Sequence, residues 1–254
     1  MPRVFRAMPR NRFLSYGDAR GGRMSNARIV LIPGLLCDAT VWQPLVKALP
    51  GGAAIADLST QDSLTRMARD CLAAHPGPLR VAGHSMGARV AMEMARLSPA
   101  RVTRLALLDT GIHPLRDGEV EKRDEIVRFA RENGMAALAD RWLAGMVHAP
   151  NRADATLMKT LKDMVLRMDA ELHARQIKAL VDRPDASAYV GDITCPVLLL
   201  VGRQDQWSPV SQHENMQKVL VNSTLRIVEG AGHFAPLERP GEVARITADF
   251  LTRP

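Results

Sequence analysis

Cysteines, aromatic residues and long apolar runs are all scarce in this chain, and each shortage excludes something. Of the 254 residues, only Cys37, Cys71 and Cys195 are cysteines, and no two of them form a C-x-x-C pair. This odd, widely spaced set argues against a disulfide framework and a cysteine-based zinc site. We therefore expect a cytoplasmic protein with no metal or other cofactor. No apolar run reaches the roughly eighteen residues of a transmembrane helix, so we expect no membrane partner.

The net charge of +7 suggests a nucleic-acid partner, but its distribution argues against one. Residues 1–23 hold six arginines and one acidic residue, Asp18, so they contribute +5 and the rest of the chain only +2. A basic tail is not a basic binding face, and an aromatic content of 4% supplies few platforms for stacked bases. The six arginines are Arg3, Arg6, Arg10, Arg12, Arg20 and Arg23. We expect no nucleic-acid partner.

Residues 1–24 are interpreted as a basic N-terminal extension. The segment lacks the apolar core of a secretory signal. Its arginine richness resembles a transit peptide, but serine is sparse, and Pro2 and Pro9 interrupt any amphipathic helix. A third interpretation is that translation starts at Met24, because the pattern of the fold begins soon afterwards.

From residue 28 onward, short apolar runs alternate with amphipathic segments. The runs predict strands at Arg28–Ile32, Ala53–Leu58, Leu79–Ala82, Val102–Leu108, Val197–Val201 and Leu225–Val228. The segments predict a helix capped by Thr40 and ending at Leu49, and further helices over Ser63–Ala74, Ala88–Leu97, Val210–Leu220 and Pro240–Leu251. This alternation predicts an α/β fold: a mostly parallel sheet of about six to eight strands with helices on both faces.

The rhythm changes between residues 113 and 192, where no strand is predicted. The pattern there favours helices at Glu119–Asn133, Met135–Val147, Ala153–Met168 and Ala170–Val181. A helical block between two parts of one sheet is best interpreted as an insertion. We assign 25–112 and 193–254 to the core domain and 113–192 to an all-helical cap.

The pentapeptide Gly83-His84-Ser85-Met86-Gly87 matches G-x-S-x-G between a predicted strand and a predicted helix. A turn this tight requires glycine two residues before and two residues after the serine, because side chains there would collide with the adjoining elements. The turn exposes the Ser85 hydroxyl at the carboxyl edge of the sheet. It also places the Met86 N–H at a helix N-terminus, where negative charge is stabilised. The pattern predicts a serine nucleophile and one oxyanion donor.

A serine nucleophile needs a base, and His233 is the best placed of seven histidines. It follows a predicted strand in the flexible loop Gly230-Ala231-Gly232-His233-Phe234, which can bring the imidazole over the sheet edge. The other assignments are a surface turn for His75, packing inside the elbow for His84, and solvated side chains for His148, His173 and His213.

Two aspartates compete to orient His233. Asp205 lies in the loop after the predicted strand Val197–Val201 and produces the chain order serine, aspartate, histidine. Its rival, Asp109, ends the strand before the cap and has helix capping as its alternative role. We favour Asp205. The second oxyanion donor is expected in the loop after the first strand, where Gly34 permits close approach and the Leu35 N–H is the candidate.

From residue 28 to 253 the chain resembles the α/β-hydrolase superfamily, and within it the small capped bacterial serine hydrolases. The elbow, the G-x-x-D-x-x-x-P loop around Asp205 and the A-G-H-F-x-P-L-E-x-P loop around His233 carry the resemblance. It implies the triad above, a cap of inserted helices and hydrolysis through an acyl-enzyme. The chain departs from the family pattern in two ways. It has Pro33-Gly34 where His-Gly is usual, and residues 1–24 do not show the two N-terminal strands that are common in larger members.

Arg89, four residues after Ser85, is the main candidate for substrate specificity. The run from Ser85 to Met92 is similar to that of the menaquinone-pathway synthase of this fold, in which an arginine here holds a substrate carboxylate. Alternatively, Arg89 bridges to the cap or to a nearby acid. Plain packing is the alternative role for the candidates to line an apolar acyl pocket, which are Trp42, Trp142, Met146, Trp207 and Phe234.

Three functions remain open. The favoured one is an esterase or lactonase that acts on a small acyl group and forms an acyl-enzyme on Ser85. The second is a carbon–oxygen lyase resembling the menaquinone-pathway synthase, and the third is a ligand-sensing protein that keeps the fold. We expect a small-molecule substrate and either a monomer or a homodimer.

Overall fold

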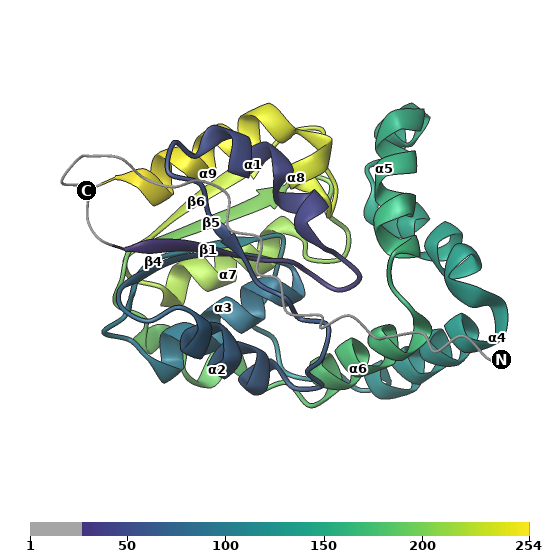
Figure 1. Ribbon diagram of the computed structural model, residues 1–254, viewed down its shortest axis with the longest axis horizontal. Coiled ribbons are helices and arrows are strands. Elements are labelled where there is room, and N and C mark those ends of the chain that lie inside the picture. The colour runs from purple at the N-terminus through teal and green to yellow at the C-terminus, as the bar shows by residue number, and fades with distance from the viewer. Residues whose placement is uncertain (1–26, 254) are drawn as a thin grey trace, which may run out of the picture.

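The computed structural model describes residues 27–253, which contain a six-stranded sheet with helices on both faces (Figure 1). The strands are β1 (Arg28–Ile32), β2 (Ala54–Ile55), β3 (Leu79–His84), β4 (Val102–Leu108), β5 (Val197–Gly202) and β6 (Ser223–Val228). They lie in the order β2-β1-β3-β4-β5-β6, and every neighbouring pair is parallel. The α/β prediction is confirmed, at the lower end of its strand range. The expected N-terminal extension and the start at Met24 fall outside the described residues.

The two faces of the sheet are covered by different helices (Figure 1). One face carries α1 (Gln43–Ala48), α8 (Ala235–Glu238) and α9 (Pro240–Thr252), and the other carries α2 (Leu64–Ala74), α3 (Met86–Leu97) and α7 (Val210–Val219). Alternate side chains of a strand point to opposite faces. Accordingly, Leu31 packs in the core on the first face, whereas Val30 and Ile32 pack in the core on the second.

Some local features differ from the sequence predictions. β2 is only two residues long. The predicted Thr40 cap is wrong: the Asp38 side chain accepts a hydrogen bond from the Thr40 N–H and opens a 3-10 turn, Ala39–Trp42, before α1. An aspartate carboxylate accepts such a bond better than threonine does, and it stands at the position that the cap requires. α3 begins two residues earlier than expected, and α8 was not predicted.

Three α-helices occupy the segment between β4 and β5 and lie together beside the sheet (Figure 1). They are α4 (Glu119–Met146), α5 (Ala155–Leu166) and α6 (Ala170–Val181). α4 is interrupted at Gly134, whose φ of +80° is not helical, at the point where the sequence predicts a boundary between two helices. We call α4, α5 and α6 the cap helices; the domain limits at 113 and 192 stay a prediction.

Two further features are absent from residues 27–253. No cluster of three or more His, Cys, Asp or Glu side chains in this range is arranged to hold a metal ion. Over the same residues, none of the helices has both the length and the apolar character needed to cross a membrane.

Candidate active site

The elbow around Ser85 has a backbone that only a tightly constrained turn produces. Ser85 lies between β3 and α3 with φ +54° and ψ −115°, in the positive-φ region that L-residues rarely adopt. A Cβ at Gly83 would overlap the Gly87 carbonyl and the backbone of Ala88, and a Cβ at Gly87 would overlap the Ile32 carbonyl of β1. Both glycines are therefore required by close backbone approach, for the reason the sequence motif predicts.

Hydrogen bonds from neighbouring elements hold this turn in place. The Ser85 N–H donates to the Leu108 carbonyl of β4 at 2.9 Å, and the Thr110 hydroxyl donates to the Ser85 carbonyl at 3.1 Å. Thr110 is held in turn, because its N–H donates to Nε2 of the buried His213 at 3.1 Å. A strained backbone conformation persists only where surrounding contacts stabilise it, and these hydrogen bonds stabilise the conformation of Ser85.

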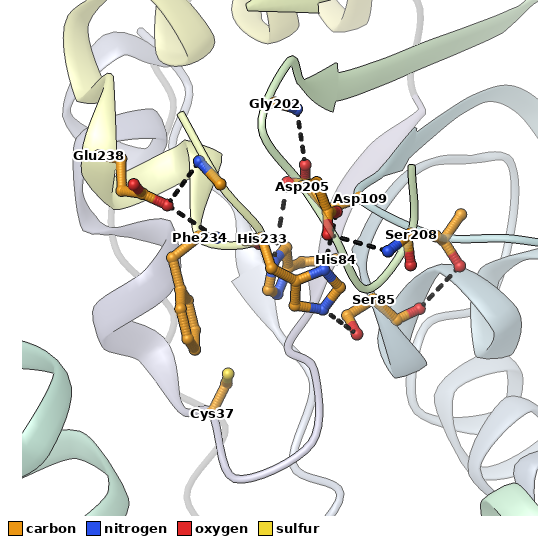
Figure 2. Close-up of polar contacts among 12 residues, drawn as sticks. Cys37, His84, Ser85, Asp109, Gly202, Asp205, Ser208, His233, Phe234 and Glu238 are labelled. Carbon is orange, nitrogen blue, oxygen red and sulfur yellow. Dashed lines mark hydrogen bonds and ion pairs between the residues drawn. The ribbon is translucent and has the colours of Figure 1, made fainter. Parts of the chain in front are cut away.

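Ser85, His233 and Asp205 form one continuous chain of hydrogen bonds (Figure 2). Ser85 Oγ lies 2.8 Å from His233 Nε2, and His233 Nδ1 lies 2.8 Å from Asp205 Oδ2. The three residues come from the loops that follow β3, β6 and β5, whose carboxyl ends meet at one edge of the sheet. Ser85 is half-buried, whereas His233 and Asp205 are buried. Such a chain can remove the serine proton as the hydroxyl attacks.

The Asp205 carboxylate is prepared to carry a negative charge. Burial opposes its ionisation, but the charge and hydrogen bond of His233 outweigh that effect, as do the N–H groups of Ser208 and Trp207, so its pKa lies below the usual range. Both N–H groups donate to Oδ1 at 2.8 Å, which leaves Oδ2 for His233. The carboxylate is thereby fixed in position and in charge.

Asp109, the rival acid, lies in the same region but does not bind His233. Its Oδ1 accepts from the Gly202 N–H at 3.0 Å, and its Oδ2 lies 3.8 Å from His84 Nε2 (Figure 2). Complete burial, followed by the charge of Asp205, raises the Asp109 pKa well above the usual range. Burial also lowers the pKa of His84 to about 3. Burial therefore disfavours the charged form of both groups, which argues against an ion pair between them.

Several histidines outside the triad are buried, in contrast to the sequence interpretation of most of them. His84 packs inside the elbow as predicted, and its Nε2 lies 2.8 Å from the His233 carbonyl, which it supports as a donor. The surface-turn assignment of His75 and the solvated assignments of His173 and His213 are wrong, because all three are buried. The helical pattern of α6 and α7 shows which face is apolar, but it does not show that another element covers a histidine.

Glu238 is a supporting residue that the sequence reasoning missed. Its Oε1 accepts from the N–H groups of Gly232 at 2.9 Å and Phe234 at 3.2 Å, on either side of His233 (Figure 2). Its Oε2 accepts from the His148 N–H at 2.9 Å and from the Asn151 side chain at 2.8 Å. One buried carboxylate therefore ties the histidine loop to the end of α4. Glu238 is the glutamate of the A-G-H-F-x-P-L-E-x-P motif, and this position was the sequence signal that could have identified it as a supporting residue.

Comparison with known proteins identifies the family of this chain. The alpha/beta hydrolase family model matches residues 29–246. The chain belongs to the alpha/beta hydrolase family. It is 29% identical over 240 residues to a pimeloyl-(acyl-carrier protein) methyl ester esterase from Photobacterium profundum, across 88% of this chain and 94% of that one.

Solved structures agree with this alpha/beta hydrolase fold. A thermophilic esterase from Thermogutta terrifontis superposes with a TM-score of 0.82 at 24% identity and covers 90% of each chain. An enol-lactonase from Burkholderia xenovorans LB400 superposes with a TM-score of 0.80 at 22% identity, across 92% of this chain and 94% of that one. At these identities the likeness establishes the fold.

In this alpha/beta hydrolase the predicted oxyanion loop lies directly against the elbow. A Cβ at Gly34 would come within 3.2 Å of the Ser85 Cβ and within 3.1 Å of the His84 carbonyl, so Gly34 allows the close approach that the sequence predicts. Leu35 follows it in the loop, and Met86 begins α3 on the other side of Ser85. The structure thus brings the two backbone segments that carry the predicted donors to the same serine.

The predicted pocket residues of this hydrolase fall into two groups. Phe234 and Met146 are buried beside the triad: Phe234 packs edge-to-face on Trp142 with ring centroids 5.7 Å apart, and the Met146 carbonyl accepts the His233 N–H at 2.8 Å. Trp207, in contrast, is 55% exposed, and its contact with the triad is made through its backbone N–H. Trp142 is partly buried and belongs to the core that the cap helices share.

Arg89 lies on α3 one turn after Ser85 in a buried, positively charged cluster. Glu119 accepts hydrogen bonds from Arg183 at 2.8 Å and from Arg123 at 2.8 Å, so its charge is shared between two guanidinium groups. Arg89 is only 8% exposed and makes two long contacts, 3.4 Å each, to the His113 carbonyl. Burial and then the charge of Arg183 lower its pKa to about 9. The cluster carries more positive than negative charge.

Proposed function

We propose that this alpha/beta hydrolase is a serine hydrolase that cleaves a small carboxylic ester or lactone. The observation that carries the proposal is the unbroken chain of 2.8 Å contacts from Ser85 through His233 to Asp205. Because the hydroxyl is already hydrogen-bonded to its base, the two groups need not move relative to each other before the serine attacks a carbonyl. The methyl ester esterase that this chain resembles over most of its length supports an ester substrate.

The geometry supports a two-step mechanism. Ser85 Oγ attacks the carbonyl carbon while His233 Nε2 takes its proton, and Asp205 stabilises the resulting imidazolium. The N–H groups of Leu35 and Met86 hold the oxyanion of the tetrahedral intermediate. When this intermediate collapses, the leaving alcohol takes the proton from His233 and the acyl group stays on Ser85. Water then repeats the cycle: it gives a proton to His233 and releases the acid with Ser85 restored.

The buried arginine cluster favours a substrate that carries an anionic group. Arg89 lacks a carboxylate partner at hydrogen-bond distance within residues 27–253, although it is 8% exposed and one helical turn from Ser85. A buried guanidinium is stabilised by a bound carboxylate, which accepts two parallel hydrogen bonds. This charge also favours the second candidate, a carbon–oxygen lyase resembling the menaquinone-pathway synthase, in which the same triad removes a proton from an anionic substrate.

We also propose a small-molecule substrate and a cytoplasmic location for this hydrolase. A small-molecule substrate, the absence of nucleic-acid and membrane partners, and a monomer or homodimer all remain predictions. The three cysteines are free, and burial raises the pKa of each thiol above its usual value. Unreactive thiols of this kind suit the cytoplasmic location that we propose.

Labelling and turnover together test the nucleophile. We expect the wild-type protein to hydrolyse p-nitrophenyl butyrate, and a fluorophosphonate probe to label Ser85, as identified by peptide mapping. Ser85→Ala should lower kcat by about 10⁴-fold or more and abolish labelling, whereas Ser211→Ala, on an exposed position of α7, should leave both unchanged. Labelling of a different residue, or a wild-type protein inert toward esters and the probe alike, contradicts the proposal.

Paired substrates test the role of Arg89. We expect Arg89→Met to lower kcat/KM for p-nitrophenyl hemiglutarate by about 100-fold, because the variant keeps the side-chain length but loses the charged hydrogen bonds. The value for p-nitrophenyl butyrate, which has no carboxylate, should change by less than about threefold. Equal losses on both substrates would show that Arg89 supports the elbow and does not hold substrate.

A further inference from the structure

The oxyanion loop contains a strained turn at Leu36. The Cys37 N–H donates to the Gly34 carbonyl at 3.2 Å, which closes a four-residue turn with Leu35 and Leu36 at its centre. Leu36 has φ +56° and is buried, at the turn position where glycine is favoured because L side chains resist a positive φ. A leucine holds this conformation only if other contacts enforce it.

The enforcing contact comes from a cap helix. Gln176 on α6 accepts the Leu36 N–H through Oε1 at 2.9 Å, across 140 positions of sequence, and both residues are buried. At the other side of the same peptide unit, the Leu35 carbonyl accepts from the Cys37 thiol at 3.2 Å. The peptide that links Leu35 to Leu36 is therefore held at both its N–H and its carbonyl.

A second contact between cap and loop lies farther out. Arg167, at the end of α5, donates from Nε to the Asp38 carboxylate at 2.7 Å and from Nη2 to the Thr40 hydroxyl at 2.7 Å. This pair is partly exposed and is correspondingly weak. The buried Gln176 contact is therefore the one that sets the central peptide of the turn.

A cavity of about 490 Å³ borders this contact. Cys37, Asp38, Met168, Leu172 and Gln176 are among its lining residues, whereas none of the triad residues is. Since Gln176 faces open space on this side, a side chain of similar size can replace it without overpacking. The hydrogen bond can therefore be removed with little change in shape.

We propose that Gln176 is a positioning residue that orders the oxyanion loop from the cap. This inference rests on the proposed hydrolase function, because the ordered group is the Leu35 N–H that receives the developing negative charge. The donor lies inside the strained turn, and its value in catalysis depends on preorganisation before the reaction begins. As a consequence, the oxyanion hole is complete only while α6 is seated against the core.

Gln176→Met tests the proposal, because methionine matches glutamine in length and lacks the acceptor. We expect kcat for p-nitrophenyl butyrate to fall by about 10-fold with KM changed by less than about threefold, since the lost interaction acts in the transition state. The fluorophosphonate labelling rate and the affinity for phenylboronic acid, whose tetrahedral adduct places an oxygen in the hole, should fall by a similar factor. A loss of kcat without these parallel losses overturns the proposal.

Gln61→Met is the matched control. Gln61 is also a buried glutamine with a side-chain hydrogen bond, 2.8 Å from Nε2 to Asp70, but it lies outside the oxyanion loop. Its variant should keep kcat within about twofold of wild type. Equal losses in the two variants, or wild-type kcat in Gln176→Met, overturn the proposal. If the methionine variant fails to fold, Gln176→Ala makes the same test, with the same predicted loss.

The wild-type protein separates this proposal from the one on which it rests. A wild type that neither hydrolyses the ester nor takes the fluorophosphonate overturns the hydrolase function and the role of Gln176 together. A wild type that is active and labelled, beside an equally active Gln176→Met protein, overturns the role of Gln176 alone.

Discussion

Among single residues, two aspartates that follow neighbouring strands have pKa values shifted in opposite directions. Asp109 and Asp205 both follow strands that end at one edge of the sheet. Burial and the nearby Asp205 raise the pKa of Asp109, whereas His233 and two backbone N–H groups lower that of Asp205 despite burial. The lowered pKa marks Asp205 as the acid that orients His233, and the raised pKa marks Asp109 as an acid with a packing role.

Isosteric amides distinguish the two carboxyl groups. We expect Asp205→Asn to lower kcat by about 10³- to 10⁴-fold, because an amide stabilises the wrong histidine tautomer and no longer balances the imidazolium. Asp109→Asn should keep kcat within about threefold, because asparagine mimics a neutral acid and tolerates the φ of +50° at this position. Steady-state kinetics on one ester makes the comparison, and equal losses would reassign the triad acid.

Asp109 also has a predicted effect on stability with a definite sign. Because its pKa is higher in the folded protein than in the unfolded chain, the folded state keeps a proton that the unfolded state releases above about pH 4. Its contribution to stability therefore falls as pH rises from that point. Asp109→Asn should gain stability relative to wild type between pH 4 and pH 8 in urea unfolding; a constant difference across this range contradicts the expectation.

Among the helices and strands, α4 shows how one glycine divides a helix. Gly134 adopts φ +80°, and the helix resumes after it, so the two amphipathic patterns predicted by the sequence meet at a bend. Gly145 lies further on in the same helix without a positive φ. A Cβ would meet open space at both positions, so only the backbone conformation separates them.

This pair provides a matched test of backbone strain. Gly134→Ala should lower the free energy of unfolding by about 1–3 kcal/mol, because alanine resists the combination of φ +80° with ψ 168°, which is nearly exclusive to glycine. Gly145→Ala should raise it by about 0.5–1 kcal/mol, because alanine restricts the unfolded chain and favours the helix. Urea unfolding of both variants measures the difference in the free energy of unfolding. Two changes of the same sign would contradict the assignment of the non-helical backbone to Gly134.

Across the molecule as a whole, buried neutral histidines make the fold sensitive to acid. Burial lowers the pKa of His84 in the elbow to about 3, that of His173 in the cap to about 4 and that of His213 beside Thr110 to about 4. In the unfolded chain each binds a proton near pH 6.5. Below that pH the unfolded state therefore holds more protons than the folded state.

Stability should consequently fall as pH drops from about 6.5 to about 4. Each histidine contributes at most about 1.4 kcal/mol per pH unit, and the three together at most about 4 kcal/mol per pH unit. Urea unfolding at pH 7 and pH 5 measures this slope, and His173→Leu should reduce it by up to about a third. A stability independent of pH over this window would contradict the neutral assignment.

Local sequence patterns were sufficient to predict the succession of strands and helices along the chain, the elbow at Ser85 and the loop that carries His233. Alternating apolar runs predict parallel strands, the carboxyl ends of those strands share an edge, and glycine is demanded where backbones approach. The site residues named in this way, Ser85, Asp205 and His233, are within hydrogen-bond distance in the structure.

Tertiary packing determines which aspartate faces His233, which histidines are buried, and what Gln176 and Glu238 bind. The Leu36–Gln176 contact spans 140 positions, and the Glu238–His148 contact spans 90. No local pattern specifies such pairs, because hydrogen bonding and burial depend on which surfaces meet after the cap helices pack against the sheet. The same packing contacts also set the pKa of each buried acid and base.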